Sequence, residues 1–308
     1  MGFLIARAVK SVDYNKNAKN PILTLEVAGY GEVQMELEPD FAPNTVATIV
    51  KLAQNGYYDG KVFYGTDSRA VAAGMSLKTE EVASDQYDEE GNYIGPEGEE
   101  YTTTQTVEED VLRVSDLDTS VTPYISEDDE NYNTTDADKR GDEATDYKIS
   151  IAGEFVANGF NDNTLRFEKG TVGLYRNNYA QYTENLNQES YNSGSSLFFI
   201  TTDEDSTLNG EYAAFGKVIK GMDIIERMLA LPLENEETDD DGHVTSDATA
   251  GTLSEEQEIT KFATASCPVI TKATVETYGV DYGMPEYMEA FDYNRYMSDL
   301  ILQYYRNQ

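Results

Sequence analysis

The sequence predicts a mainly β fold of antiparallel strands, with two short helices and a third helix near the end of the chain. Residues 22–27 and 33–37 each alternate apolar and polar side chains, and a Gly-Tyr-Gly turn separates them. Residues 194–201 form an apolar, β-prone run that is entered through small residues. Helical spacing of apolar residues is confined to short stretches.

The first elements follow in the order hairpin, helix and strand. Residues 22–27 and 33–37 are expected to pair as a hairpin. Pro43 then stands in the first turn of a helix, where proline is well tolerated, and Gly56 ends it. One face of that helix is apolar: Val46, Ile49, Val50 and Ala53. A turn and a strand running through Val62 and Phe63 come next.

A second hairpin is expected in the second half of the chain. The run 194–201 and the segment 208–218 are predicted to be its two strands, with Asn209-Gly210 as the turn dipeptide. Residues 221–228 then change to helical spacing. The last strand is expected at 269–277.

Composition excludes several classes of function. The chain has 308 residues and a net charge of −36, which makes nucleic acid an unlikely partner class and disfavours anionic membrane surfaces. Its one Cys and one His cannot build a disulfide framework or a multi-cysteine metal site. His243 lies in an acidic, turn-like run without a nucleophile pattern. Calcium-loop patterns placed on Gly91 or Gly242 lack required carboxylates. We therefore expect no metal and no cofactor.

Charge and composition divide the chain into segments. Residues 1–19 are expected to be an N-terminal segment, and 20–283 the main domain. Two acidic stretches interrupt that domain, at about 76–150 and about 234–258. Residues 79–150 contain 23 Asp or Glu and 4 Lys or Arg, a balance of −19. Such runs are usually solvated loops.

The C-terminal segment, 284–308, is expected to be an amphipathic helix. Its apolar residues recur at helical spacing: Met288, Phe291, Met297, Leu300, Ile301 and Tyr304. This stripe is expected to pack on the main domain or on a second copy of the chain, so self-association is one predicted interaction.

The sequence contains no run long and apolar enough for a membrane span. Residues 3–6 are too short to be the core of a signal peptide. The compartment stays open between the cytoplasm and export or cell-surface display after removal of a leader.

The order of motifs resembles the cyclophilin family of peptidyl-prolyl cis-trans isomerases, in particular its bacterial, clostridial-type members. The matching stretches are Ala42-Pro43-Asn44-Thr45-Val46, Gly56-Tyr57-Tyr58-Asp59-Gly60, Gly153-Glu154-Phe155, Gly194-to-Ile200, Leu208-Asn209-Gly210 and Gly221-Met222-Asp223. The resemblance implies a closed, eight-stranded antiparallel β-barrel with two capping helices. It also implies a groove that binds proline-containing peptides or proteins.

The resemblance places the following residues in that groove: Phe63, Tyr64, Val71, Tyr175, Arg176, Leu197, Phe199, Leu208 and Tyr212. Phe199 corresponds to the floor of the proline slot, Leu208 to its wall and Tyr212 to its rim. The family uses a fixed Arg to donate a hydrogen bond to the prolyl nitrogen, and that position is Gly65 here. The pocket Phe and the Gln that orients the Arg correspond to Ala70 and Ala73. Arg69 and Arg176 are candidate substitutes, although surface ion pairs are the favoured role for both.

These departures leave three hypotheses. The first is a weak or inactive isomerase that binds proline-containing clients as a chaperone-like or interaction module. The second is an active isomerase that uses Arg69 or Arg176. The third is a structural or assembly module that uses the acidic insertion or the C-terminal helix, with Tyr175 filling the groove.

Overall fold

A computed structural model describes residues 19–67, 69–83, 86–87, 93–95, 101–108, 111–125, 141–181, 184–233 and 259–306. Three parts of the sequence discussed above lie outside these ranges: residues 1–18, Gly91 with its neighbours 88–92, and the second acidic stretch with His243. Among the helices of the described ranges, none has the length and apolarity needed to cross a membrane.

The molecule is mainly β, and every strand pairing in the described residues is antiparallel. The strands are β1 (Ile22–Val27), β2 (Gly31–Leu37), β3 (Lys61–Thr66), β4 (Ala70–Ala83), β5 (Gln86–Tyr87), β6 (Tyr93–Gly95), β7 (Tyr101–Glu108), β8 (Ile149–Ser150), β9 (Thr171–Leu174), β10 (Phe198–Thr201), β11 (Ala214–Lys220), β12 (Thr260–Lys261), β13 (Ile270–Glu276) and β14 (Met288–Glu289). The helices are α1 (Pro43–Gln54), α2 (Val114–Leu117), α3 (Asn187–Tyr191), α4 (Met222–Met228) and α5 (Tyr293–Arg306).

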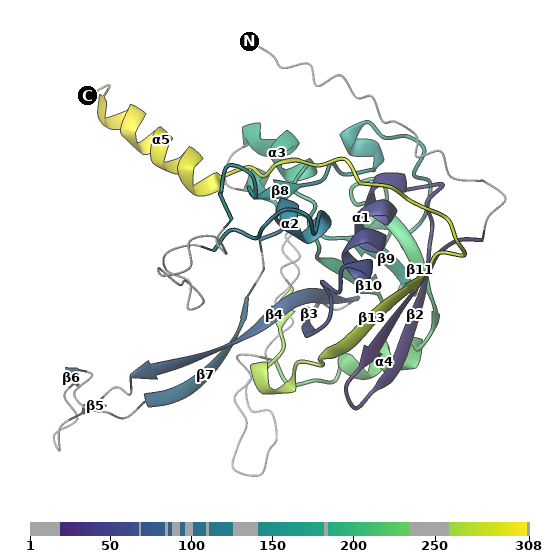
Figure 1. Cartoon of the computed structure of the whole chain (residues 1–308), viewed down its shortest axis with the longest axis horizontal. Helices are drawn as coiled ribbons and strands as arrows, with labels where there is room; N and C mark the ends of the chain where they lie inside the picture. Colours follow the sequence, from purple (N-terminus) through teal and green to yellow (C-terminus); the bar gives the residue numbers. More distant parts are fainter. Residues whose placement is uncertain are drawn as a thin grey trace.

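The main sheet follows the order β12-β3-β4-β10-β9-β11-β2-β1-β13 and curls into a half-barrel (Figure 1). Its two ends approach each other where β3 and the residue before it meet the start of β13 and the residues that precede β13. The Gly60 N–H donates to the Ile270 carbonyl at 2.8 Å, and the Phe63 N–H donates to the Pro268 carbonyl at 2.9 Å. An isolated bridge joins Val62 and Val269.

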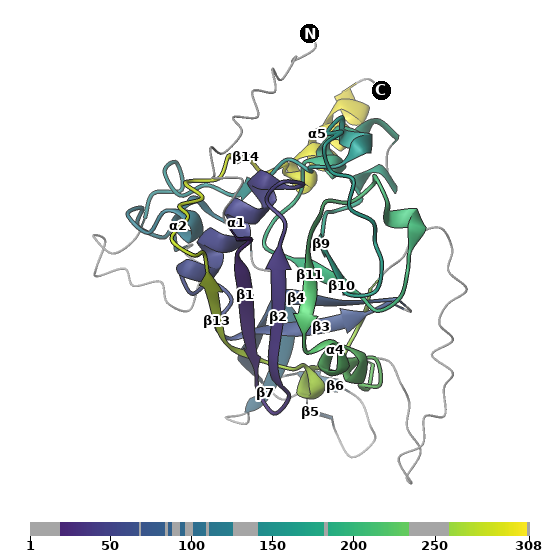
Figure 2. The same ribbon diagram turned by 90° about the vertical axis from the view of Figure 1, so that its right-hand side faces the viewer.

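Helices α1 and α4 lie toward opposite ends of the sheet (Figure 2). The expected apolar face of α1 is confirmed, because Val46, Ile49, Val50 and Ala53 are all buried. Glu154, itself buried, holds the first turn of α1: its carboxylate accepts hydrogen bonds from the Asn44 N–H at 3.0 Å and the Thr45 N–H at 2.8 Å. These bonds satisfy N–H groups that have no partner within the helix.

The first hairpin is confirmed: Ile22 pairs with Glu36 and Val27 with Gly31. The second predicted hairpin is wrong, because β10 and β11 are not neighbours and β9 lies between them. The segment that connects them is too long for a two-residue turn. It contains a 3₁₀ turn at Ser206–Leu208, and the Asn209 side chain accepts a hydrogen bond from the Phe167 N–H at 2.9 Å. Asn209-Gly210 therefore closes a loop and not a hairpin.

The described part of the first acidic insertion has two components. Strand β4 continues past the sheet and pairs with β7 as a ribbon that projects from the body (Figure 1). Residues 111–125 and 141–148 form a folded patch around Asp146, which is fully buried. The Asp146 carboxylate accepts hydrogen bonds from the Ser115 N–H at 2.7 Å and the Tyr124 N–H at 2.6 Å.

The C-terminal helix begins later than the sequence suggested. Residues 284–292 run as extended chain that includes β14, which pairs with β8, and α5 begins at Tyr293. Helix α5 extends away from the body (Figure 1) and buries none of its residues.

Candidate functional site

Three neighbouring strands carry most of the positions that the sequence assigned to a groove. Gly65 of β3 pairs with Ala72 of β4, and Ala72 pairs in turn with Phe199 of β10. Tyr175 and Arg176 follow directly after β9, which pairs with both β10 and β11. Leu208 and Tyr212 lie in the loop between β10 and β11. The fold thus brings the predicted positions to one region of the sheet.

Phe199 lies in an aromatic stack. Its ring stacks on Phe167 at a centroid distance of 5.5 Å and meets the Tyr212 ring edge-on at 5.6 Å. Gly173 makes room for this stack, since a Cβ there would lie 2.4 Å from Phe199 Cζ and 2.6 Å from Phe167 Cε1. The side chains of Phe199 and Leu208 are 4% and 8% exposed. The two residues predicted to form the floor and wall of a slot are therefore almost closed to solvent.

The strands beside this stack are covered more completely. Phe63, Val71, Ala73 and Leu197 have no exposed surface, and Tyr64 is 3% exposed. The Tyr64 carbonyl accepts a hydrogen bond from the Phe262 N–H at 2.8 Å, so the chain around β12 lies against β3 here. A peptide can touch these side chains only if the residues that bury them move.

At Gly65 the covering segment is β12. Lys261 pairs with Gly65, and Thr260 pairs with Thr66. A Cβ at residue 65 would lie 2.6 Å from the Thr260 carbonyl oxygen and 2.6 Å from Ile259 Cγ2. Atoms at this distance overlap, so only glycine is compatible with β12 in this position.

Arg176 is held by its own surroundings. Its Nε donates to the Glu211 carbonyl at 3.1 Å, and its guanidinium lies 3.9 Å from the Glu211 carboxylate. The guanidinium carbon also lies 4.5 Å from the ring centre of Tyr212 and 5.2 Å from that of Tyr191. Cation–π contacts of this kind favour a fixed position for the charge. The Arg176 side chain is 12% exposed.

Arg69 is much more accessible. Its side chain is 47% exposed, and the guanidinium lies 3.8 Å from the carboxylate of Asp205, which is 1% exposed. The backbone N–H of Arg69 donates to Asp67 Oδ1 at 2.6 Å. Of the two arginines considered from the sequence, Arg69 therefore has the greater freedom to move.

Two ionisable groups near the stack have altered proton affinities. Burial raises the pKa of the Tyr212 phenol, and the adjacent Arg176, which lowers it, offsets only part of that effect. Burial also raises the pKa of Asp67, against the lowering effect of the backbone hydrogen bonds from Arg69 and Ala70. Tyr212 is thus a neutral phenol at neutral pH.

Comparisons with known proteins identify the family of this chain. Residues 22–249 match the family model described as cyclophilin type peptidyl-prolyl cis-trans isomerase/CLD. The chain belongs to this family. Probable peptidyl-prolyl cis-trans isomerases of Brucella suis biovar 1 and Brucella abortus are 26% and 25% identical to it over 198 residues. That alignment covers 64% of this chain and 66% of each relative, so it spans just under two thirds of the relatives' length.

Solved cyclophilin structures are similar at lower identity. A cyclophilin type isomerase of Cryptosporidium parvum is 15% identical with a TM-score of 0.40, and the match covers 84% of this chain and 98% of the other. The cyclophilin AquaCyp293 of Hirschia baltica is 18% identical with a TM-score of 0.36, with 82% and 73% covered.

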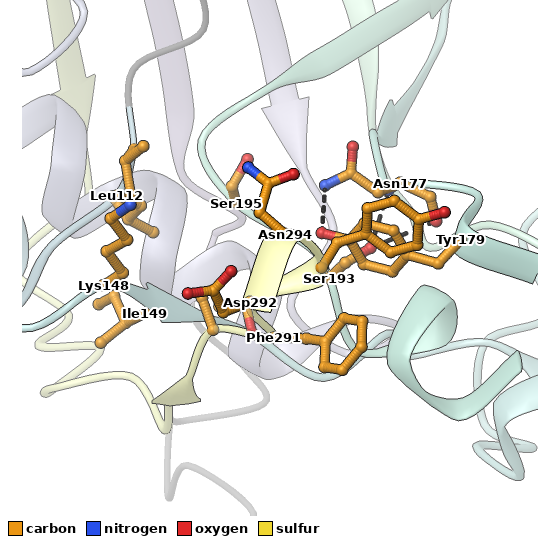
Figure 3. A pocket seen from close by; sticks show the side chains of 14 residues that line it. Leu112, Lys148, Ile149, Asn177, Tyr179, Ser193, Ser195, Phe291, Asp292 and Asn294 are labelled. Atoms are coloured by element: carbon orange, nitrogen blue, oxygen red, sulfur yellow. Dashed lines mark hydrogen bonds between the residues drawn. The ribbon is translucent and has the colours of Figure 1, made fainter. Parts of the chain in front are cut away.

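Two hollows of this cyclophilin lie outside the predicted groove, and the sequence did not indicate either. One, of about 380 Å³, lies between β8, the loop after Arg176 and the start of α5 (Figure 3). Lys148, Asn177, Ser193 and Asp292 contribute polar groups to it. The other, of about 630 Å³, lies between β3 and the Asp146 patch.

The wall supplied by residues 290–294 comes from beyond the segment that matches the family model. Phe291, which lines this wall, belonged to the apolar stripe of the C-terminal segment, and we interpreted that stripe only as a helix face. The described residues contain no cluster of three or more His, Cys, Asp or Glu arranged to bind a metal.

Proposed function

We propose that this cyclophilin binds proline-containing segments of client proteins and is a weak or inactive isomerase. The observation that carries the proposal is the packing at Gly65. The family position for the catalytic donor has no side chain, and the main chain of Thr260 fills the adjacent space. A groove that binds a proline-containing segment without isomerising its X–Pro bond would serve a chaperone-like or interaction role.

The chemistry explains why this position decides activity. Rotation about an X–Pro bond crosses a barrier of about 18–20 kcal/mol, which amide resonance creates. A preorganised donor to the prolyl nitrogen lowers the barrier because it stabilises the twisted state more than the planar one. Removal of one such donor costs about 10²–10³ in rate in other enzymes.

The second candidate function is an active isomerase that uses Arg69. Its support is the 47% exposure of the Arg69 side chain and the length, 3.8 Å, of its ion pair with Asp205. Arg176 is the poorer substitute, since Glu211 and the aromatic rings already occupy its guanidinium. In this mechanism the Arg69 side chain leaves Asp205 when a peptide binds.

Two-dimensional exchange NMR on an Ala-Pro peptide separates the two candidates. Under our proposal, substoichiometric protein shifts or broadens the peptide signals but adds no cis–trans exchange peaks. Exchange peaks that disappear in Arg69→Ala and persist in Arg176→Ala would instead establish the second candidate.

The binding groove has its own test. Phe199→Ala is expected to weaken peptide binding at least about tenfold, because it removes the floor of the slot. Phe215→Ala is the matched control, since Phe215 is equally buried in β11 but is not a groove position. Equal affinity of both variants for the peptide, with both folded by circular dichroism, would refute binding at Phe199.

The proposal also includes the closed, eight-stranded form of the family barrel. The hydrogen bonds from Gly60 to Ile270, the first residue of β13, and from Phe63 to Pro268, just before β13, support closure between β3 and β13. Slow exchange of those two amide protons, comparable with amides inside β1 and β2, would support a barrel that is closed in solution.

A further inference from the structure

Helix α5 has a wide apolar surface without a described partner. Five of its residues are large apolar side chains with more than a third of their surface exposed: Leu300 38%, Ile301 52%, Leu302 54%, Tyr304 64% and Tyr305 70%. An isolated helix of 14 residues is only marginally stable in water, because nucleation is costly and a short helix forms few hydrogen bonds to offset that cost. A helix of this composition is normally stabilised by packing its apolar face.

The base of the helix is fixed to the body. Tyr293 stacks on Tyr179 at 5.5 Å with an interplanar angle of 8°, and Phe291 meets Tyr179 edge-on at 5.3 Å. Asp292 caps the first turn, where Oδ1 accepts a hydrogen bond from the Arg295 N–H at 2.9 Å. The helix is therefore held in a defined direction, away from the sheet (Figures 1 and 2).

The charges of α5 all avoid one face. Met297, Leu300 and Tyr304 follow the three- and four-residue spacing of a coiled-coil seam, and Ile301 flanks it. The positions beside this seam, Tyr296, Ile301 and Gln303, carry no charge. The charged residues, Arg295, Asp299 and Arg306, lie on the opposite face together with Leu302.

We propose that α5 pairs with α5 of a second copy of this chain, in antiparallel orientation, through Met297, Leu300, Ile301 and Tyr304. An uncharged seam is self-complementary, which a two-fold interface requires. An anionic membrane is a poor alternative occupant, because the chain carries a net charge of −36. The helix itself carries two Arg and one Asp. Two copies of the helix therefore do not repel each other as strongly as the two acidic bodies do.

The negative charge of the bodies favours the antiparallel orientation of the two helices. A parallel pair would place both acidic bodies side by side at the N-terminal ends of the helices. An antiparallel pair places them at opposite ends of a helix about 21 Å long, at a rise of about 1.5 Å per residue. Repulsion between the bodies is screened within about 8 Å at physiological salt but extends to about 30 Å at 0.01 M. Dimerisation is therefore expected to strengthen as salt increases over that range.

Analytical ultracentrifugation of the full chain tests the interface. The wild type is expected to form concentration-dependent dimers at physiological salt, and Leu300→Glu with Ile301→Glu to raise the dimer dissociation constant about tenfold or more, since a carboxylate in an apolar seam is costly. Leu302→Glu is the control, because it places one such carboxylate on the opposite face of the same helix. Its dissociation constant is expected to stay close to that of the wild type.

Two outcomes would overturn the interface. A wild type that stays monomeric throughout the concentration range shows that no second copy occupies the helix. Equal loss of the dimer in Leu302→Glu shows that the seam is not the contact face.

A cysteine variant tests the orientation. Tyr304→Cys forms a disulfide between two copies only in a parallel pair, where position 304 faces itself. The native thiol does not interfere, since the one cysteine of the chain, Cys267, is buried. We expect no such disulfide under mild oxidation, and its rapid formation contradicts the antiparallel arrangement.

Discussion

The absence of a side chain at Gly65 permits a close contact between β3 and β12. Its lack of a Cβ lets β12 pair with β3 at a point where any other residue would overlap the Thr260 carbonyl. The resemblance predicts that this position corresponds to the guanidinium donor of the family. A side chain at residue 65 would overlap β12 where the structure places it.

Gly65→Ala is expected to reduce the free energy of unfolding by about 1–3 kcal/mol, because overpacking forces neighbouring atoms to move. Gly65→Arg is expected to destabilise at least as much and to restore no isomerase activity. Urea denaturation measures the first effect and peptide exchange NMR the second.

The double variant Gly65→Ala/Ile259→Ala serves as the control for this packing. It removes the Ile259 contact but leaves the Thr260 carbonyl, so only part of the lost stability should return. Full stability in Gly65→Ala alone would show that β12 does not lie against residue 65 in solution.

Asp67 makes the stability of the folded protein depend on pH. Burial raises its pKa in the folded protein, so the folded state binds this proton more tightly than the unfolded state does. The contribution of Asp67 to stability is therefore largest at low pH and is lost as pH rises through the raised pKa. Asp67→Asn keeps the Oδ1 acceptor for the Arg69 N–H and removes the titration.

We expect Asp67→Asn to be more stable than the wild type at pH 7, and the difference to shrink as pH falls below the raised pKa. Urea denaturation of both proteins across that range is the measurement. A constant difference at all pH values would assign the effect to packing.

At the scale of elements, Glu154 connects the loop after β8 to α1. Its buried carboxylate accepts two backbone N–H bonds and the Thr45 hydroxyl at 2.8 Å. An acidic group at a helix N-terminus also interacts favourably with the helix dipole. One side chain thus positions the helix against the sheet.

Glu154→Gln is expected to cost about 1–3 kcal/mol of unfolding free energy, because the amide turns a donor toward N–H groups that then lack an acceptor. Glu204→Gln makes the same chemical change at an exposed position and should have little effect. Chemical denaturation of both variants gives the comparison, and equal stabilities would show that the Glu154 contacts contribute little.

The elements also show what the sequence can predict. The hairpin β1–β2 and the helix α1 follow from local patterns, since alternation, Pro43 and Gly56 each act within a few residues. The pairing of β11 with β9 and β2 does not, because strand order depends on contacts distant in sequence. For the same reason β12 was missed: it has two residues, and its partner β3 lies about 200 positions earlier.

For the site as well, local motifs supported predictions and contacts distant in sequence did not. The family motifs assign Phe199, Leu208 and Tyr212 to a groove and Gly65 to the donor position, and these assignments stay predictions. They gave no sign that Tyr191 and Tyr212 surround Arg176, because Tyr191 is contributed by a different segment, α3. The sequence likewise did not predict that α5 would be exposed, since an amphipathic pattern indicates an apolar face but not what covers that face.

The whole molecule is dominated by negative charge. The net charge of −36 comes from 58 acidic and 22 basic residues, and residues 79–150 account for about half of it. Ion pairs seen in the described residues, such as Lys220 with Glu32 at 2.6 Å, are mostly exposed and contribute little. Self-repulsion of this size destabilises the compact state.

The last prediction concerns salt. The midpoint of thermal unfolding at pH 7 is expected to rise as NaCl increases from about 10 mM to about 500 mM, because the Debye length falls from about 30 Å to a few ångströms. Near the isoelectric point, about 4.1 from the sequence, the net charge vanishes and the salt dependence should nearly disappear. Calorimetry at both pH values is the measurement. A salt effect of equal size at both would mean that the ions act by preferential exclusion and not by screening. A rise limited to pH 7 would show that like-charge repulsion limits the stability of this fold.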